Sequence, residues 1–199
     1  MTMPAQQMTI DPLGAFVAGA FISGSERPMP LISTSFDVSI EAGLVTVVTT
    51  REFRNDEPES IEATITFPVP VHAVLFDLEA RIDGRVLKAR AQRKSQARET
   101  YEGAIDSGKS AILHEEVLRG VHMLSVGHIG AGTSIEVRST WAITLSYATD
   151  RGHVRIPLTV GDIYGRSGLP DSDDLIHGGP LQYADLSVQC RDGRVDPHY

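Results

Sequence analysis

The stretch with the most explicit chemical pattern covers residues 103–110 and reads G-A-I-D-S-G-K-S. It fits the phosphate-loop pattern, in which a glycine-rich loop is followed by Lys and then Ser or Thr. In such a loop, backbone N–H groups at a helix N-terminus surround the phosphate, and the lysine neutralises its charge. A nucleotide site here would use Gly103, Gly108, Lys109 and Ser110, and would make the protein a nucleotide-dependent enzyme.

The residues around this stretch favour a different interpretation. A phosphate loop follows a buried strand and opens a helix, whereas residues 93–102 (R-K-S-Q-A-R-E-T-Y-E) are mostly charged or polar. Four apolar residues in this region recur at helical spacing. They are Ala97, Tyr101, Ala104 and Ile105. This spacing predicts one short helix at about residues 94–107, with Gly108 as its C-terminal cap. The negative end of the helix dipole would then face the phosphate. The capped helix is therefore the favoured interpretation, and the nucleotide site is the alternative.

The histidines give no metal pattern. The chain has seven of them, at His72, His114, His122, His128, His153, His177 and His198. None pair at i, i+4 on a predicted helix, and the single cysteine, Cys190, offers no partner for a zinc site. His122 and His128 flank one predicted turn, and we expect both to be surface imidazoles.

Carboxylates give no catalytic or calcium pattern. The acidic loop with Asp171, Asp173 and Asp174 lacks the ligand spacing and the glycine of an EF-hand. Glu115 and Glu116 are adjacent, so in a strand they would point to opposite faces. We therefore expect no metal, no cofactor, no catalytic residue and no enzymatic activity.

Composition limits the remaining classes. A chain of 199 residues with 41% hydrophobic content forms one domain, or one domain and part of a second. A net charge of −8 argues against a nucleic-acid surface, which needs clustered Lys and Arg. The apolar run at residues 13–22 is too short to cross a bilayer. We interpret it as a strand or tail that packs on the domain, and we expect no membrane segment in this chain.

Strand patterns dominate the rest of the chain. They cover residues 35–40, 44–53, 61–67, 74–82, 86–91, 110–117, 121–126, 133–147, 154–158 and 186–190. Asp83-Gly84 predicts a tight hairpin between two of them. Within residues 74–82 the expected buried face comprises Val74, Phe76, Leu78, Ala80 and Ile82. The pattern predicts an all-β fold, an antiparallel β-sandwich of about eight to nine strands with one short α-helix.

Three segments are expected along the chain. Residues 1–29 would be an N-terminal tail or accessory strand, and residues 30–164 the β-sandwich domain. The Gly-, Pro-, Ser- and Asp-rich stretch near residues 164–180 predicts a linker. Residues 165–199 would therefore hold this linker and the start of a following region that is truncated here.

Five separate motifs resemble those of the VIT (vault protein inter-alpha-trypsin) domain. They are I-E-A-T-I-T-F-P-V-P from Ile61, F-D-L-E-A-R-I-D-G-R from Phe76, A-R-E-T-Y-E from Ala97, L-S-V-G-H-I from Leu124 and R-I-P-L-T-V from Arg155. The resemblance covers about residues 30–164. It implies a β-sandwich with a short helix that acts as a non-catalytic interaction or scaffold module. VIT domains usually precede a von Willebrand factor type A domain, whose D-x-S-x-S metal motif this chain lacks.

The favoured function is therefore a protein-interaction or scaffold module that braces or presents a downstream von Willebrand factor type A domain. Its partner would be that domain or another protein. We expect the contact surface around the helix, at Arg98, Glu99, Tyr101 and Glu102. Tyr101 fits core packing equally well, and Arg98 and Glu102 have the i, i+4 spacing of a surface ion pair. The alternative is the nucleotide-binding enzyme described above.

Overall fold

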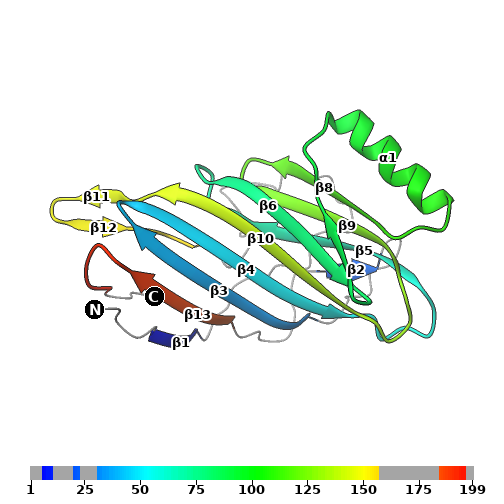
Figure 1. Cartoon of the computed structure of the whole chain (residues 1–199), viewed down its shortest axis with the longest axis horizontal. Coiled ribbons are helices and arrows are strands. Elements are labelled where there is room, and N and C mark those ends of the chain that lie inside the picture. Colours follow the sequence, from blue (N-terminus) through cyan, green and yellow to red (C-terminus); the bar gives the residue numbers. More distant parts are fainter. Residues whose placement is uncertain (1–5, 11–19, 23–30, 157–183, 196–199) are drawn as a thin grey trace, which may run out of the picture.

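The computed structural model describes residues 6–10, 20–22, 31–156 and 184–195, which form thirteen strands and one helix (Figure 1). In chain order these are β1 (Gln6–Ile10), β2 (Ala20–Ile22), β3 (Leu31–Glu41), β4 (Leu44–Arg54), β5 (Ile61–Pro68), β6 (Val74–Ile82), β7 (Arg85–Lys88), α1 (Lys94–Asp106), β8 (Ala111–Leu118), β9 (Val121–Ile129), β10 (Ser134–Thr144), β11 (Ser146–Ala148), β12 (Arg151–His153) and β13 (Ala184–Cys190). The predicted all-β fold with one short helix is confirmed.

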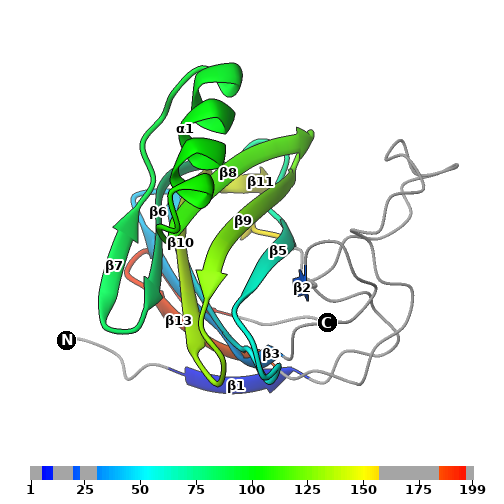
Figure 2. The same ribbon diagram turned by 90° about the vertical axis from the view of Figure 1, so that its right-hand side faces the viewer.

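Two sheets stack face to face (Figure 2). The main sheet has seven strands in the order β1-β13-β3-β4-β10-β6-β7, and the second sheet has the order β2-β5-β9-β8. A separate ribbon pairs β11 with β12. Every pairing is antiparallel except that of β13 with β3, which is parallel. The prediction of an antiparallel sandwich holds for the rest of the described strands.

The predicted segment boundaries fall within this arrangement. Strands β1 and β2 lie in the expected N-terminal segment, yet they pair with β13 and β5. Strand β13 lies in the expected C-terminal segment and pairs with β3. The acidic loop at residues 171–174 and most of the predicted linker lie outside the described residues. The three-part division of the chain therefore stays a prediction.

The core lies between the sheets and contains a large apolar cluster. Its buried members are Phe36, Val38, Ile40, Val45, Val47, Phe53, Ile61, Ala63, Phe67, Val69, Leu78, Ala80, Ile82, Leu124, Val126, Ile129, Ile135, Val137 and Trp141. They alternate with exposed or half-buried residues along most strands, as expected where one face of each sheet is covered. Burial of this apolar surface is the main favourable contribution to folding.

Two hairpin turns fix the register of the main sheet. Ala42 and Gly43 join β3 to β4 with φ of 52° and 72°. Asp83 and Gly84 join β6 to β7 with φ of 50° and 72°. Two successive residues with positive φ are the signature of the type I′ turn, whose twist matches that of the strands. The predicted hairpin at Asp83-Gly84 is confirmed.

The predicted alternation is wrong in the first half of β6. The register with β10 shifts between Thr140 and Trp141, whose partners are Asp77 and Leu75, so Phe76 is an extra, bulged residue. A bulge reverses the facing of the residues beyond it. Leu75 therefore packs toward the core, whereas Val74 and Phe76 are 64% and 61% exposed.

Two other strand predictions also need correction. The long signal at residues 133–147 is not one strand, because β10 ends at Thr144 and the Leu145 N–H bonds to the Gly43 carbonyl. The chain then enters the separate β11–β12 ribbon. Val154 and Ile156 pack against the core without forming a strand. Their apolar spacing reflects packing rather than ladder pairing.

Candidate interaction surface around helix α1

Helix α1 has no side-chain cap at its N-terminus. Arg93 precedes it in an extended conformation and offers no side-chain cap. Lys94–Asp106 carries no acidic residue in its first turn and no basic residue in its last turn. Such a helix lacks favourable interactions with its dipole, and thirteen residues are marginal for a helix in water. Its stability must therefore come from docking on the sandwich.

The helix ends inside the sequence that matches the phosphate-loop pattern. Gly108 has a φ of 71°. Its N–H donates to the Ile105 carbonyl at 2.8 Å, and the Lys109 N–H donates to the Ala104 carbonyl at 3.0 Å. These two bonds form the Schellman motif of a helix C-terminus. The predicted cap at Gly108 is confirmed.

This geometry differs from that of a phosphate site. Gly103 lies within the helix, and Gly108 and Lys109 follow its C-terminal end. Backbone N–H groups that would bind phosphate are already bonded to helix carbonyls. The helix end presents its negative dipole to this loop, which disfavours an anion.

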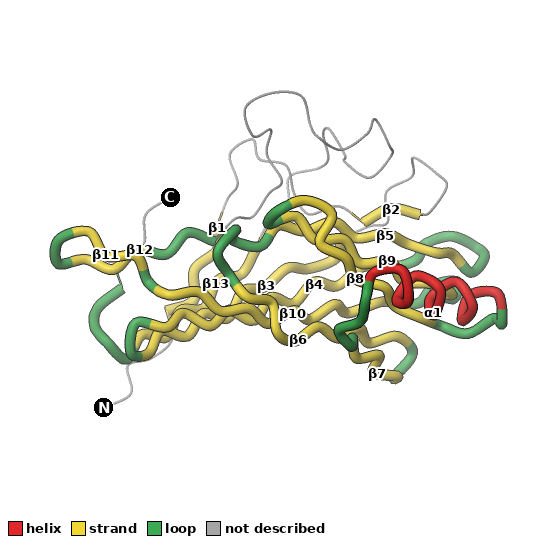
Figure 3. The backbone as a smooth tube through the Cα atoms, turned by 90° about the horizontal axis from the view of Figure 1, so that it is seen from above, coloured by secondary structure: helices red, strands yellow, loops and turns green. Residues whose placement is uncertain are grey.

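Helix α1 forms a third layer on the outer face of the second sheet (Figures 2 and 3). The outer face at this point includes Glu62 and Gly127, which alternate with the core residues Ala63 and Val126. A Cβ at Gly127 would overlap the Cδ1 atom of Ile105. The helix can lie this close to β9 because Gly127 has no side chain.

Tyr101 crosses this glycine and reaches β5. It is the one buried residue of the helix, and its hydroxyl donates a hydrogen bond to Glu62 Oε1. Burial and, secondarily, the Glu62 carboxylate raise the pKa of the phenol. The tyrosine therefore stays neutral and anchors the C-terminal half of α1. His128 Nε2 lies 3.2 Å from the Ile105 carbonyl and adds a second contact there.

Glu115 anchors the N-terminal half. Its side chain is only 5% exposed and accepts two bonds from Arg98, at 2.9 and 3.1 Å, while Lys94 Nζ lies 3.4 Å away. Burial alone would raise the pKa of this carboxyl, but hydrogen bonding and charge from Arg98, then Lys94, hold it below its ordinary value. A bidentate Arg–carboxylate pair of this kind is stronger than a surface ion pair.

The four predicted surface residues divide into two groups. Arg98 and Tyr101 bind the sheet and position the helix. Glu99 and Glu102 are exposed, and the described residues supply no ion-pair partner for either. The predicted Arg98–Glu102 pair is replaced by Arg98–Glu115, because Glu115 reaches the guanidinium from β8 with both oxygens. A role for these four residues at an interface stays a prediction.

Sequence reasoning missed the residues that receive the helix. Glu62, Glu115 and Gly127 lie on three neighbouring strands, and none forms a local motif with α1. One signal was available for Gly127, because a glycine inside a strand marks a close approach. Glu115 and Glu116 do point to opposite faces, as expected, since Glu115 is buried and Glu116 is exposed.

A stack of rings and one guanidinium lies inside the sandwich. Arg51 is 2% exposed, and its Cζ lies 5.8 Å from the centre of the Phe36 ring and 5.1 Å from that of Phe67. Among the described residues no carboxylate forms an ion pair with it. Burial lowers its pKa to about 10. The faces of the Phe36 and Phe67 rings give the guanidinium favourable cation–π contacts.

The stack continues through two histidines. His114 Nε2 and His122 Nδ1 are 2.9 Å apart, and their rings stack at 5.1 Å and both lie beside Phe67. Burial, then the neighbouring His122, lowers the pKa of His114 to about 4, and burial also lowers that of His122. Both rings are therefore neutral near pH 7.

The expectation of a surface imidazole is wrong for His122, which is 9% exposed, but holds for His128. Register explains the miss. Glu116 lies opposite His122, so His114 comes diagonally close on the same face.

The two histidines pack against Phe67 and against one another. The part of the chain that the structure describes contains no group of three or more His, Cys, Asp or Glu side chains placed to hold a metal ion. It also contains no helix that is long and apolar enough to span a membrane.

Comparisons with known proteins agree with the fold and its motifs. The profile of the vault protein inter-alpha-trypsin domain matches residues 31–141, which is more than half of the chain. The chain belongs to the VIT family. The match begins at β3 and ends within β10, so it contains α1 and all the residues that hold it.

Several curated relatives carry von Willebrand factor A domains in their names. Rat von Willebrand factor A domain-containing protein 5A is 33% identical over 131 residues, which cover 65% of this chain and 15% of that protein. The human protein of the same name is 33% identical over 126 residues, covering 62% of this chain and 15% of that protein. Mouse protein mono-ADP-ribosyltransferase PARP4 is 26% identical over 136 residues, which cover 68% of this chain and 7% of that protein.

The matched region is therefore a small part of each relative. These family and protein names indicate an interaction role for the VIT domain. A solved structure from Legionella pneumophila aligns with a TM-score of 0.38 at 9% identity, over 68% of this chain and 47% of that one. This TM-score is too low to indicate a shared fold or function.

Proposed function

We propose that this VIT domain is a non-catalytic scaffold module that braces or presents a von Willebrand factor type A domain, with the outward side of α1 as its contact surface. The way in which α1 docks on the second sheet supports this proposal. Tyr101 and Arg98 hold the helix on the sheet, which leaves Glu99 and Glu102 exposed on a third layer outside the sandwich. The names of the relatives supply the type A domain as the partner to test.

Its charge and its small number of anchoring contacts both suit α1 for this role. Glu99 and Glu102 lie in successive turns of the helix and present carboxylates to a partner. Such exposed charges set specificity and association rate more than raw affinity. A helix that depends on a few polar anchors can also adjust its position when a partner binds.

Calorimetric titration with the type A domain of rat von Willebrand factor A domain-containing protein 5A tests the proposal. The matching segment of that rat protein is the positive control. We expect this chain to bind, and the double variant Glu99→Lys, Glu102→Lys to bind about tenfold more weakly because two exposed carboxylates are reversed. Arg119→Glu, an exposed change in the β8–β9 turn, is the matched control.

Binding by the rat segment without binding by this chain would refute the proposal. Equal affinities for the double variant and the wild type would move the contact away from α1.

The nucleotide-dependent alternative has only its letter pattern in support. Equilibrium binding of ATP by the wild type, lost in Lys109→Ala, would overturn our choice. We expect neither protein to bind ATP, because the loop amides cap a helix C-terminus.

A further inference from the structure

The edge of the main sheet at β6 and β7 is a second exposed feature of the described residues. Strand β7 pairs with β6 only along Glu79–Ile82, where Lys88 faces Glu79 at the last register position. One further bond joins the Ala89 N–H to the Leu78 carbonyl. Residues 74–77 pair with β10 on one side and with no described strand on the other. We name residues 74–77 the open edge.

Apolar side chains project from this edge. The bulge in β6 turns Phe76 outward, so that it is 61% exposed and Val74 is 64% exposed. Val71, in the loop before β6, is 47% exposed. Bulges often re-aim a side chain for function, and an unpaired strand with exposed apolar residues is a template for another strand.

The chain beside the open edge is basic. Residues 85–98 read R-V-L-K-A-R-A-Q-R-K-S-Q-A-R, which contains six Lys or Arg and no Asp or Glu. This run contrasts with the net charge of −8 of the whole chain. Its middle part leaves β7 next to Leu78 and rises to α1 on the same side of the molecule (Figure 2). All of residues 88–93 are exposed.

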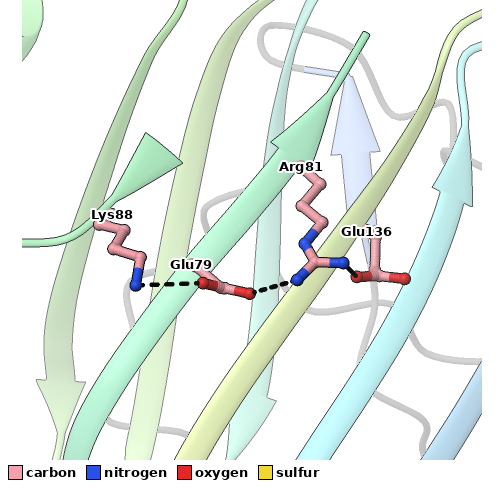
Figure 4. A network of polar contacts seen from close by, with 4 residues as sticks. All are labelled: Glu79, Arg81, Lys88 and Glu136. Atoms are coloured by element: carbon pink, nitrogen blue, oxygen red, sulfur yellow. Dashed lines mark hydrogen bonds and ion pairs between the residues drawn. The ribbon is translucent and has the colours of Figure 1, made fainter. Parts of the chain in front are cut away.

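Three of these six cationic side chains already form ion pairs. Lys88 lies 3.8 Å from Glu79, which also bonds Arg81, and Arg81 reaches Glu136 of β10 (Figure 4). Lys94 and Arg98 bind Glu115. The described residues supply no ion-pair partner for the other three, which are Arg85, Arg90 and Arg93. Asp77 is the single carboxylate in residues 71–78 and cannot neutralise three guanidinium groups.

We propose that the open edge binds an extended, acidic segment of a partner protein by strand addition. The backbone of this segment would bond to the N–H and C=O groups of residues 74–77 that point away from β10. Its apolar side chains would pack against Val74 and Phe76. Its carboxylates would pair with Arg90 and Arg93. Main-chain bonds supply affinity in this mode, and alternate side chains supply specificity.

The charge pattern selects this occupant over a second copy of the chain. Two copies joined edge to edge would bring two basic stretches together, and like charges at an interface oppose association. The inference rests on the proposed interaction function but uses a different surface from α1, so the two can fail separately.

Fluorescence anisotropy with synthetic peptides of about ten residues, the length of a long strand, tests the inference. The probe alternates Val or Ile with Asp or Glu. One control replaces every acid with Lys, and a second carries N-methyl groups on alternate residues, which removes donors along one edge. We expect only the first peptide to bind, and its affinity to fall as salt is raised.

Variants of the protein locate the site. Phe76→Ser should weaken binding of the acidic peptide about tenfold because it removes apolar contact area. The double variant Arg90→Glu, Arg93→Glu should weaken it by at least as much. Leu44→Ser, another exposed apolar position on the main sheet, and Arg194→Glu, an exposed position after β13, should bind as the wild type does.

Equal binding of the basic or the N-methylated peptide would overturn the inference, and so would unchanged binding by Phe76→Ser. Gel filtration that shows a dimer lost in Phe76→Ser would overturn it in favour of a second copy. If no peptide binds while the type A domain binds, this inference fails and the proposed function stands. If the acidic peptide binds and the type A domain does not, this inference stands and the proposed function fails.

Discussion

The sandwich interior and the layer formed by α1 are held by different forces. Nineteen buried apolar residues from both sheets fill the interior. The helix buries a single side chain, Tyr101, and depends on Glu62, Glu115 and the space above Gly127. Regions with few buried apolar contacts open at lower free energy than the core. We therefore expect α1 to open at lower free energy than the strands of the sandwich.

The largest expected effect is in the interior. Phe53 is fully buried, so Phe53→Ala should lower the free energy of unfolding by about 3–5 kcal/mol. Tyr101→Phe, which removes only the bond to Glu62, should cost about 1 kcal/mol. Chemical denaturation measures both. An equal loss in the free energy of unfolding for Tyr101→Phe and Phe53→Ala would contradict the expected difference between the helix and the interior.

Two glycine variants should change stability in opposite directions. Gly127→Ala places a Cβ where Ile105 lies and should cost about 1–3 kcal/mol by displacing α1. Gly103→Ala faces open space within the helix and should stabilise by up to about 1 kcal/mol. Thermal unfolding of both proteins provides the measurement. A neutral Gly127→Ala would mean that α1 does not need this close approach.

Acid should destabilise the interior first. The folded-state pKa of His114 is lowered to about 4, so its stabilising contribution is present above the ordinary histidine pKa of about 6.5. That contribution is lost as pH falls from about 6.5 toward 4. Denaturation across this range should show a loss of stability that His114→Phe reduces. An identical pH profile for the variant would contradict the assignment.

The α1 layer should respond to acid at a lower pH. The folded-state pKa of Glu115 is depressed, so the stability it gives is present above the ordinary carboxyl pKa of about 4.3 and is lost as pH falls further. Loss of the helical circular-dichroism signal below this pH tests the point. Glu115→Gln should lose that step and weaken docking already at neutral pH. Helix loss between pH 6.5 and 5 would reverse the order of the two regions.

The smallest effect on stability should come from the outward side of α1. Glu99→Lys should change the free energy of unfolding by less than about 0.5 kcal/mol, because the residue is exposed. The same change should still weaken binding of the type A domain. A large stability loss would show that Glu99 supports the fold rather than a partner.

Local patterns predicted most of the fold. Alternation located the long strands, the Asp83-Gly84 pair located one hairpin, and helical spacing located α1 with its Gly108 cap. The failures depended on contacts between distant residues. The bulge at Phe76 is set by register with β10, and the parallel partner of β13 cannot be inferred from its own residues.

The candidate site was predictable only in part. Arg98, Glu99, Tyr101 and Glu102 could be proposed because they lie on one short helix, and their role at an interface stays a prediction. Their partners on the sheet were missed because they come from three strands. The His114–His122 stack depends on a diagonal contact across a ladder, and its local sequence carries no sign of burial.

Hydrogen exchange with and without the rat type A domain tests whether α1 is a weakly held helix that binds this partner. In the free protein, amides of α1 should exchange faster than those of β4, β9 and β10, because the helix opens locally. With the type A domain bound, α1 should gain protection while the interior strands do not change. Two results would contradict this expectation. One is that the amides of free α1 exchange as slowly as those of the core strands, and the other is that the bound type A domain protects other amides but not those of α1.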